Sequence, residues 1–402
     1  MTQLHVGHAR ARITPPLGIT MMGYGARTEG AVAIHDDLWA NAVALSDGEQ
    51  QLLMLALDVC EMPLYTTHLL KGAIMQATGL EPDQILINTS HTHAGPDVGV
   101  IVSEDPLALY EPAYFVEFAQ LCANVCQRAL ADLATAALRV GRAEVDAGVS
   151  RRERTPEGTT VIGVNPDGPR MPVLTVWTFS RPERPDVVWW SLPLHGATVT
   201  GDNLQISAEW MGAAVRRFEA DHDQAVAIFL QGCCGDQNPY RERNSFEQMD
   251  EHGVDVALAL EDALASSQDV ESLPLVHRWH TVLLPSARGG CQRLPVHGLR
   301  LGDAALVSLA GEPFVAYALY GQELRPGPAT MVLGYTDGTV GYLPTADAFE
   351  EGGYEPNSWK GFADGEPLTP EVDAIVKETI AAMFGELDGT DVESATSAGE
   401  ES

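Results

Sequence analysis

Two histidines separated by one residue follow an apolar run, in the sequence Asn-Thr-Ser-His-Thr-His-Ala-Gly-Pro at residues 88–96. The apolar residues 84–88 have the pattern of a buried strand. Residues two apart in an extended backbone point to the same side, so His91 and His93 are expected to converge on one point. Functional groups in open α/β sheets gather beyond the carboxyl ends of strands. The pair is therefore a candidate metal or catalytic site, although two solvated loop histidines would show the same spacing.

A third histidine, His195, ends another apolar run, after the strand-like segment that carries Trp189 and Trp190. A single histidine in such a place is commonly structural. Imidazoles at two strand ends are, however, what a zinc ion or a similar divalent ion with nitrogen and oxygen ligands requires. Together, His91 and His195 therefore indicate a metal site.

Several further segments resemble the catalytic region of the neutral, non-lysosomal ceramidase family. The similar segments are Ala-Arg-Ile-Thr-Pro-Pro at 11–16, Met-Gly-Tyr-Gly at 22–25 and Tyr-Glu at 354–355. The family's Thr-His-Thr-His-Ser-Gly-Pro motif is similar to Ser-His-Thr-His-Ala-Gly-Pro at 90–96. In that motif the first histidine binds zinc and the second faces the substrate. The resemblance therefore implies His91 as a zinc ligand and His93 as a polar contact to the substrate.

The resemblance also implies the rest of a site for one Zn2+ ion per chain. The family's second histidine ligand is similar to His195, and its glutamate ligand is similar to Glu312 in Ala-Gly-Glu-Pro. Its tyrosine ligand falls on Tyr342, and a second, substrate-facing tyrosine falls twelve residues later on Tyr354. Taken alone, Tyr342 would be interpreted as an aromatic residue of a strand, and Glu312 as a carboxylate at a helix start.

Two more positions bear on the chemistry. The family places an arginine near the carbonyl of the scissile amide, and in the similar segment Ser-Arg-Arg at 150–152 Arg151 is the better match and Arg152 the alternative. A solvated basic turn would have the same sequence. Where the family has Gly-Asp-x-Ser-Pro, this chain has Gly-Asp-Gln-Asn-Pro, so Asn238 replaces a serine. Asparagine cannot attack a carbonyl, but its amide can donate a hydrogen bond to an oxyanion.

The resemblance implies a zinc-dependent hydrolase of the neutral ceramidase type that cleaves an amide (N-acyl) bond. A metal-activated water would be the nucleophile, because zinc lowers the pKa of bound water to about 7 and polarises a carbonyl. The expected catalytic contacts are His93, Arg151, Tyr354 and Asn238, and the expected partner is a small-molecule N-acyl or ester substrate. Two alternatives remain open. One is a zinc-dependent esterase, lactonase or hydrolase of a sugar-linked bond at the same site; the other is a metal-binding protein without turnover, which Asn238 would favour.

Strands and helices alternate along the chain, which predicts an α/β fold with mixed β-sheets flanked by helices, like the ceramidase catalytic domain. Residues 52–58, 65–77 and 84–88 read as strand, helix and strand, which favours a parallel pair. Further strands are expected at 172–179, 187–194 and 225–231 and near 281, 305 and 331, and helices at 111–137, 208–220, 247–265, 314–324 and 370–384. We expect residues 1–385 to form one catalytic domain and the acidic residues 386–402 to form a disordered tail.

The composition is that of a globular protein with unusual acidity: 56 Asp and Glu against 24 Lys and Arg give a formal net charge of -32 in 402 residues. A field of this sign repels nucleic acid and anionic membrane surfaces, so neither is an expected partner. The first residues lack the pattern of a secretory signal and no apolar run could cross a bilayer, which favours a cytoplasmic protein without stable membrane association. The six cysteines do not predict a disulfide framework.

Overall fold

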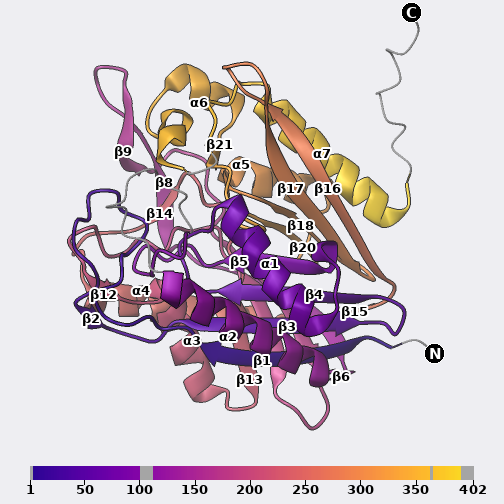
Figure 1. Cartoon of the computed structure of the whole chain (residues 1–402). Coiled ribbons are helices and arrows are strands. Elements are labelled where there is room, and N and C mark those ends of the chain that lie inside the picture. Colours follow the sequence, from indigo (N-terminus) through magenta and orange to yellow (C-terminus); the bar gives the residue numbers. More distant parts are fainter. Residues whose placement is uncertain (1–2, 100–111, 363–364, 391–402) are drawn as a thin grey trace, which may run out of the picture.

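The computed structural model describes residues 3–99, 112–362 and 365–390, and the described chain contains three main sheets with helices on their outer faces (Figure 1). The first sheet has the strand order β5-β4-β3-β1-β6, and within it only the pair β4–β5 is parallel. Its strands are β1 (His5–Arg12), β3 (Trp39–Ser46), β4 (Gln51–Leu57), β5 (Ile85–Thr89) and β6 (Ala134–Thr135). Helix α1 (Leu64–Thr78) joins β4 to β5, so the predicted strand-helix-strand unit with a parallel pair is confirmed.

The second sheet has the strand order β13-β11-β10-β7-β15, with β11 and β13 parallel. Its strands are β7 (Ala137–Glu144), β10 (Val173–Ser180), β11 (Asp186–Ser191), β13 (Ala225–Phe229) and β15 (Gln268–Val270). The parallel pair is connected through α3 (Glu209–Asp221), which returns the chain to the end of the sheet at which β11 began. The carboxyl ends of β11 and β13 therefore lie side by side.

The first two sheets pack face to face, with helices on both outer sides. Strand β4 is buried on both faces because Leu53 and Leu55 pack against α1 and α2 (Pro112–Ala131), whereas Met54 packs against the second sheet. In the same way Trp189 of β11 enters the core between the sheets, while Trp190 packs under α3 and α4 (Phe246–Ala265). This alternation follows from the period of two in a strand. Four layers result, in the order helices, sheet, sheet, helices.

A third sheet of order β16-β17-β18-β20 closes one end of this sandwich and carries α5 and α7 on its outer face (Figure 1). Its elements are β16 (Leu275–Pro285), β17 (Cys291–Leu301), β18 (Ala304–Leu309), β20 (Thr330–Leu333), α5 (Val315–Leu324) and α7 (Val372–Asp388). Leu299, Leu301 and Leu306 from its inner face join the core between the first two sheets. The short elements are β2 (Ala33–Ile34), β8 (Gly148–Arg154), β9 (Thr160–Asn165), β12 (Gln205–Ile206), β14 (Gln237–Pro239), β19 (Glu312–Pro313), β21 (Tyr342–Leu343), α6 (Ala346–Glu351), η1 (Pro82–Gln84) and η2 (Glu355–Gly361).

The predicted α/β architecture with mixed sheets is confirmed, but two helices end at least four residues away from their predicted ends. The helix expected over 111–137 ends at Ala131, and β6 and β7 follow it, because Leu138 and Val140 of β7 enter the core between the sheets. Helix α7 continues to Asp388, three residues into the segment expected to be a disordered tail, because Leu387 packs in the core under the third sheet. Residue 111 and residues 391–402 of these two expectations lie outside the described residues.

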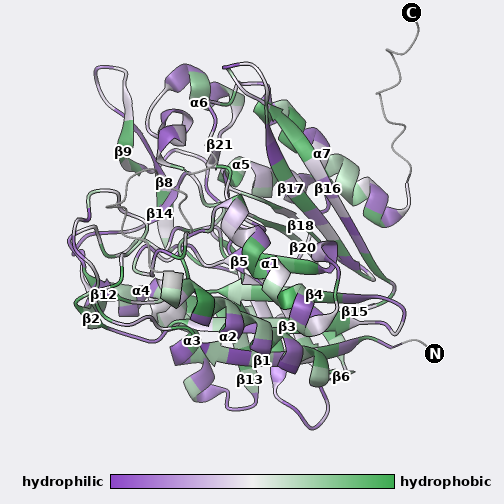
Figure 2. Cartoon of the chain, in the orientation of Figure 1, coloured by the Kyte–Doolittle hydropathy of each residue, from purple (hydrophilic) through white to green (hydrophobic). Residues whose placement is uncertain are grey.

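The distribution of hydropathy agrees with the layered arrangement. In Figure 2 the helices alternate between green and purple along their length, which shows one apolar and one polar side. Within the part of the chain that the structure describes, no helix is both long enough and apolar enough to span a bilayer.

Candidate active site

Polar side chains from three loops meet at one end of the sheets. His91 follows β5, His195 follows β11, and Glu312 follows β18. The first two loops are in direct contact, since the backbone amide of His93 donates a hydrogen bond to the carbonyl of Gly196 at 2.8 Å. The ends of strands β5 and β11 therefore lie close together, as predicted, and the site draws residues from segments that follow strands of all three sheets.

The glutamine side chain after β13 fixes the two histidine loops to each other. The amide nitrogen of Gln231 donates to the carbonyl oxygens of Ser90 at 3.0 Å and Leu194 at 3.1 Å. Its backbone amide in turn donates to the side chain of Asn88 at 2.8 Å. Gln231 is fully buried, so these bonds are shielded from water and hold the loops in one arrangement.

Glu312 does not begin a helix, as its sequence context alone suggested, because α5 starts only at Val315. It lies in the two-residue strand β19, whose partner is β21, and the parallel register places Glu312 opposite Tyr342. This pairing brings together two residues that are thirty positions apart in the sequence. Gly341 and Gly311 both have positive φ, which lets the chain turn into this short pair.

His91 and His93 converge, but not through the extended backbone that their spacing predicted. Strand β5 ends at Thr89, and His91 has a φ of 60°, in the left-handed region that residues other than glycine rarely occupy. Nε2 of His93 lies 3.0 Å from Nε2 of His91. The ring of His93 rests on Gly23, where an added Cβ would approach the imidazole to 2.6 Å, so this position admits only glycine.

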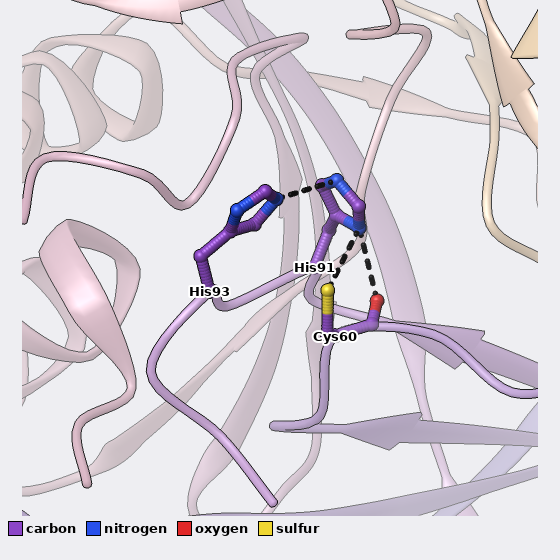
Figure 3. Close-up of side chains that lie close together, drawn as sticks. All are labelled: Cys60, His91 and His93. Atoms are coloured by element: carbon purple, nitrogen blue, oxygen red, sulfur yellow. Dashed lines mark hydrogen bonds between the residues drawn. The ribbon is translucent and has the colours of Figure 1, made fainter. Parts of the chain in front are cut away.

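The orientation of both histidine rings is set by backbone carbonyls. Nδ1 of His91 donates to the carbonyl of Cys60 at 3.0 Å, and Nδ1 of His195 donates to the carbonyl of Cys234 at 2.7 Å. A carbonyl can only accept, so each Nδ1 carries the proton and each Nε2 presents a lone pair. Figure 3 shows the two sides of the His91 ring, one facing Cys60 and the other facing His93.

The lone pairs of the two histidines point at a carboxylate. Oε2 of Glu312 lies 3.4 Å from Nε2 of His91 and 3.5 Å from Nε2 of His195. Burial lowers the pKa of His195 to about 3, so its ring is neutral. These three residues form a group whose ligand atoms all lie within 4.8 Å of one another and could hold a metal ion.

A second group of possible ligands contains Cys60, His91 and His93. The thiol of Cys60 lies 3.6 Å from Nδ1 of His91, on the side of the ring that already bonds to the Cys60 carbonyl (Figure 3). Burial raises the pKa of this thiol well above its usual value, which disfavours the thiolate that metals bind. The group with Glu312 is therefore the better metal site.

The arginine that the sequence favoured lies against these residues. Arg151 donates from Nη1 to Nε2 of His195 at 3.0 Å and from Nη2 to the hydroxyl of Tyr342 at 2.9 Å. Burial raises the pKa of Tyr342 well above its usual value, although the guanidinium of Arg151 opposes this. The ring of Tyr354 packs edge-on against that of Tyr342, with 5.7 Å between centroids. The four residues form one continuous wall.

Arg152, the alternative, has a different role. Its Nη1 pairs with Oε2 of Glu355 at 2.5 Å, and Nη2 donates to the carbonyl of Gly352 at 2.8 Å. The other oxygen of Glu355 accepts from Nε of Arg151 at 2.9 Å. One fully buried carboxylate therefore holds both guanidinium groups and fixes the direction of Arg151. The solvated basic turn that the sequence also allowed is excluded, since both arginines are buried.

All eight predicted site residues line one cavity of about 720 Å³. They are His91, His93, Arg151, His195, Asn238, Glu312, Tyr342 and Tyr354. Asn238 reaches the cavity because β14 pairs with β8 in a register that places it opposite Val149. Tyr354 remains 48% exposed and therefore stands at the mouth.

Sequence reasoning missed the residues that orient the ligands. Tyr335 donates its hydroxyl to Oε2 of Glu312 at 3.0 Å and lies over the ring of His91, with 4.2 Å between centroids. Glu355 and Gln231 were missed as well. Glu355 had one signal, because it directly follows Tyr354 in the similar segment, whereas an isolated tyrosine or glutamine carries no local signal.

Residues 4–253 match the sequence model of the family described as neutral/alkaline non-lysosomal ceramidase, N-terminal. The chain therefore belongs to this ceramidase family. The resemblance inferred from the sequence motifs is confirmed, and the family places the chain among hydrolases that act on amide bonds. No curated protein matches the sequence.

Solved ceramidase structures have the same fold. The neutral ceramidase from Pseudomonas aeruginosa superposes with a TM-score of 0.78 at 18% identity, covering 100% of this chain and 77% of the other. A structure described as ceramidase complexed with C2 superposes with a TM-score of 0.80 at 17% identity, covering 100% and 78%. The ceramidase fold therefore extends beyond the matched residues 4–253, to the segments that carry Glu312 and Tyr342.

Proposed function

We propose that the chain is a zinc-dependent amide hydrolase that acts on a small N-acyl compound. One observation carries the proposal. Nε2 of His91 and Nε2 of His195 lie 3.4 and 3.5 Å from Oε2 of Glu312, and the Nδ1 atom of each histidine is held by a backbone carbonyl on the opposite side of the ring. Three buried ligand atoms that lie within 4.8 Å of one another can surround one cation, and two nitrogens with one oxygen suit zinc.

Zinc would be held by His91, His195 and Glu312, with the hydroxyl of Tyr342 as a fourth ligand once Arg151 moves aside or shares it. When bound, the ion supplies Lewis acidity and lowers the pKa of water. The hydrogen bonds from Nδ1 of both histidines are the orienting contacts that metal-binding imidazoles usually have.

The other residues of the cavity position the substrate. Arg151 and Tyr354 offer donors to a carbonyl oxygen that gains negative charge, and each such donor is worth about 3 kcal/mol in comparable sites. Burial lowers the pKa of His93 well below its usual value, so its ring is neutral and would serve as a polar contact to the substrate. Asn238 can donate a hydrogen bond, but it cannot be the nucleophile. Water is therefore the nucleophile in this proposal.

Elemental analysis of the purified protein tests the metal. We expect about one zinc per chain in the wild type and its loss in His91→Ala, His195→Ala and Glu312→Gln. His68→Ala, which changes an exposed histidine, is the control and should keep the metal. Full zinc content in the first three variants would reject the assignment.

Substrate hydrolysis tests the reaction. N-octanoyl amides and the matched octanoyl esters are offered to the zinc-loaded protein, before and after chelation and after zinc is added back. We expect amide hydrolysis that disappears on chelation and returns with zinc. Hydrolysis of the esters alone would indicate an esterase instead, and bound zinc without any turnover would indicate a metal-binding protein, which the serine-to-asparagine difference at Asn238 would explain.

A further inference from the structure

The wall of the cavity beside His91 contains a carboxyl group that neither the fold nor the proposed reaction explains. Glu61 follows Cys60, whose carbonyl orients the ring of His91, and it lines the same cavity. Glu61 is only 8% exposed, and its Oε2 has no hydrogen-bond partner among the described residues. A buried oxygen without a partner is costly, which suggests that a ligand supplies one.

A second carboxyl group lines the cavity near the first. Asp97 accepts a hydrogen bond from the amide of Gly99 at 2.7 Å, and it lies close enough to Glu61 for their charges to interact. In the described part of the chain, neither Glu61 nor Asp97 forms an ion pair with a lysine, an arginine or a histidine.

Arg27 lines the same cavity, and one of its nitrogens, Nη2, has no hydrogen-bond partner among the described residues. Nη1 of Arg27 donates to the carbonyls of Met22 and His93, both at 2.8 Å, and Nε donates to the carbonyl of Gly201 at 3.4 Å. Its guanidinium therefore braces the His93 loop. The lining contains three arginines and three carboxyl groups, and Glu61 and Asp97 are the two carboxyl groups that form no ion pair in the described part of the chain.

We propose, on the basis of the proposed amide hydrolysis, that Glu61 together with Asp97 binds an ammonium group on the amine half of the substrate. The substrate class is then a monoacylated diamine, in which one nitrogen carries the acyl group and the other remains a cation. Glu61 offers an unpaired acceptor, and Asp97 adds the charge that favours an ammonium over a neutral hydroxyl. Glu61 is thus a specificity-determining residue.

A series of octanoyl amides that differ only at the far end of the amine tests this inference. The amines are 1,4-diaminobutane, 4-aminobutanol and butylamine, which end in an ammonium, a hydroxyl and a methyl group. For the zinc-loaded wild type we expect kcat/KM to be at least about tenfold higher for the ammonium compound than for the methyl compound, with the hydroxyl compound between them.

The isosteric variant Glu61→Gln keeps the shape, removes the charge and replaces one acceptor oxygen with an amide donor. We expect it to lose most of the preference for the ammonium compound, through KM, while its zinc content stays unchanged. Asp97→Asn should lose part of the preference, and Glu323→Gln, at an exposed position of α5, should lose none. A wild type that treats the three compounds alike, or a preference that survives in Glu61→Gln, would overturn the inference.

Failure of the reaction is separable from failure of this inference. If the wild type cleaves none of the amides, the proposed function fails, but the intact compounds can then be titrated into the zinc-loaded protein by calorimetry. Tighter binding of the ammonium compound, lost in Glu61→Gln, would still support the binding site. If the amides are cleaved without any preference, the reaction stands and the ammonium site does not.

Discussion

Replacing Tyr335 by phenylalanine removes one hydroxyl from behind the proposed metal site and leaves the ligands themselves intact. That hydroxyl donates to Oε2 of Glu312 at 3.0 Å and accepts from the thiol of Cys234 at 3.1 Å. Contacts that orient a metal ligand contribute roughly 10- to 100-fold to metal affinity. The zinc dissociation constant of Tyr335→Phe should therefore rise by that factor, which equals about 1.4 to 2.7 kcal/mol.

The assay is a zinc titration of the metal-free protein in competition with a chromophoric chelator. Tyr317→Phe is the matched control, because Tyr317 is also fully buried and its hydroxyl donates to the carbonyl of Pro344 at 2.9 Å, away from the cavity. Both variants should lose about 1 kcal/mol of unfolding free energy, since each leaves a buried acceptor without its donor. Equal zinc affinities in Tyr335→Phe and Tyr317→Phe would refute the orienting role of Tyr335.

Two further predictions concern stability. Asp337 is buried between Lys71 and His297 and bonds to both. Asp337→Asn leaves the buried ammonium of Lys71 without its counter-charge, so the unfolding free energy from urea denaturation should fall by roughly 3 to 5 kcal/mol. A fall of less than about 1 kcal/mol would contradict this. Burial lowers the pKa of His8 to about 4, below the value near 6.5 of an unfolded chain, so the unfolded state takes up the proton first and stability falls as the pH drops from 6.5 to 4. The wild type should lose up to about 3 kcal/mol more than His8→Gln over this interval, and parallel pH profiles of unfolding free energy would exclude the effect.

Hydropathy patterns predicted the elements in which periodicity and burial agree. Strand β4 with helix α1 and strand β5 were found because the strands are apolar throughout and the helix has a clear period. Strand β7 was not predicted, and the expected helix was extended to its first residue, Ala137, since the small side chains before it also fit a helical pattern. The choice between helix and strand at these residues depends on the pairing of β7 within the second sheet, and a local sequence pattern does not contain that pairing.

The site residues also differ in whether a local sequence pattern could identify them. His91 and His195 were recognisable from residue type and from their place after strands. Glu312 and Tyr342 required the family resemblance, because the two-residue pair β19–β21 that joins them is held by contacts far apart in the sequence. Glu61 was missed altogether, since an isolated acidic residue has no distinguishing local context.

The buried carboxylate of Asp337 has a consequence for how the chain could be divided. Its Oδ1 accepts a hydrogen bond from the amide of Ile87 in β5 at 3.0 Å, and its backbone amide donates to the carbonyl of the same residue at 2.7 Å. A cut in the exposed turn at Gly289 would place His91 and His195 in one fragment and Glu312 in the other. Neither fragment would contain the three proposed ligands. Metal uptake would then occur only when the two pieces associate, so a split version of this chain would report its own reassembly through the metal it binds.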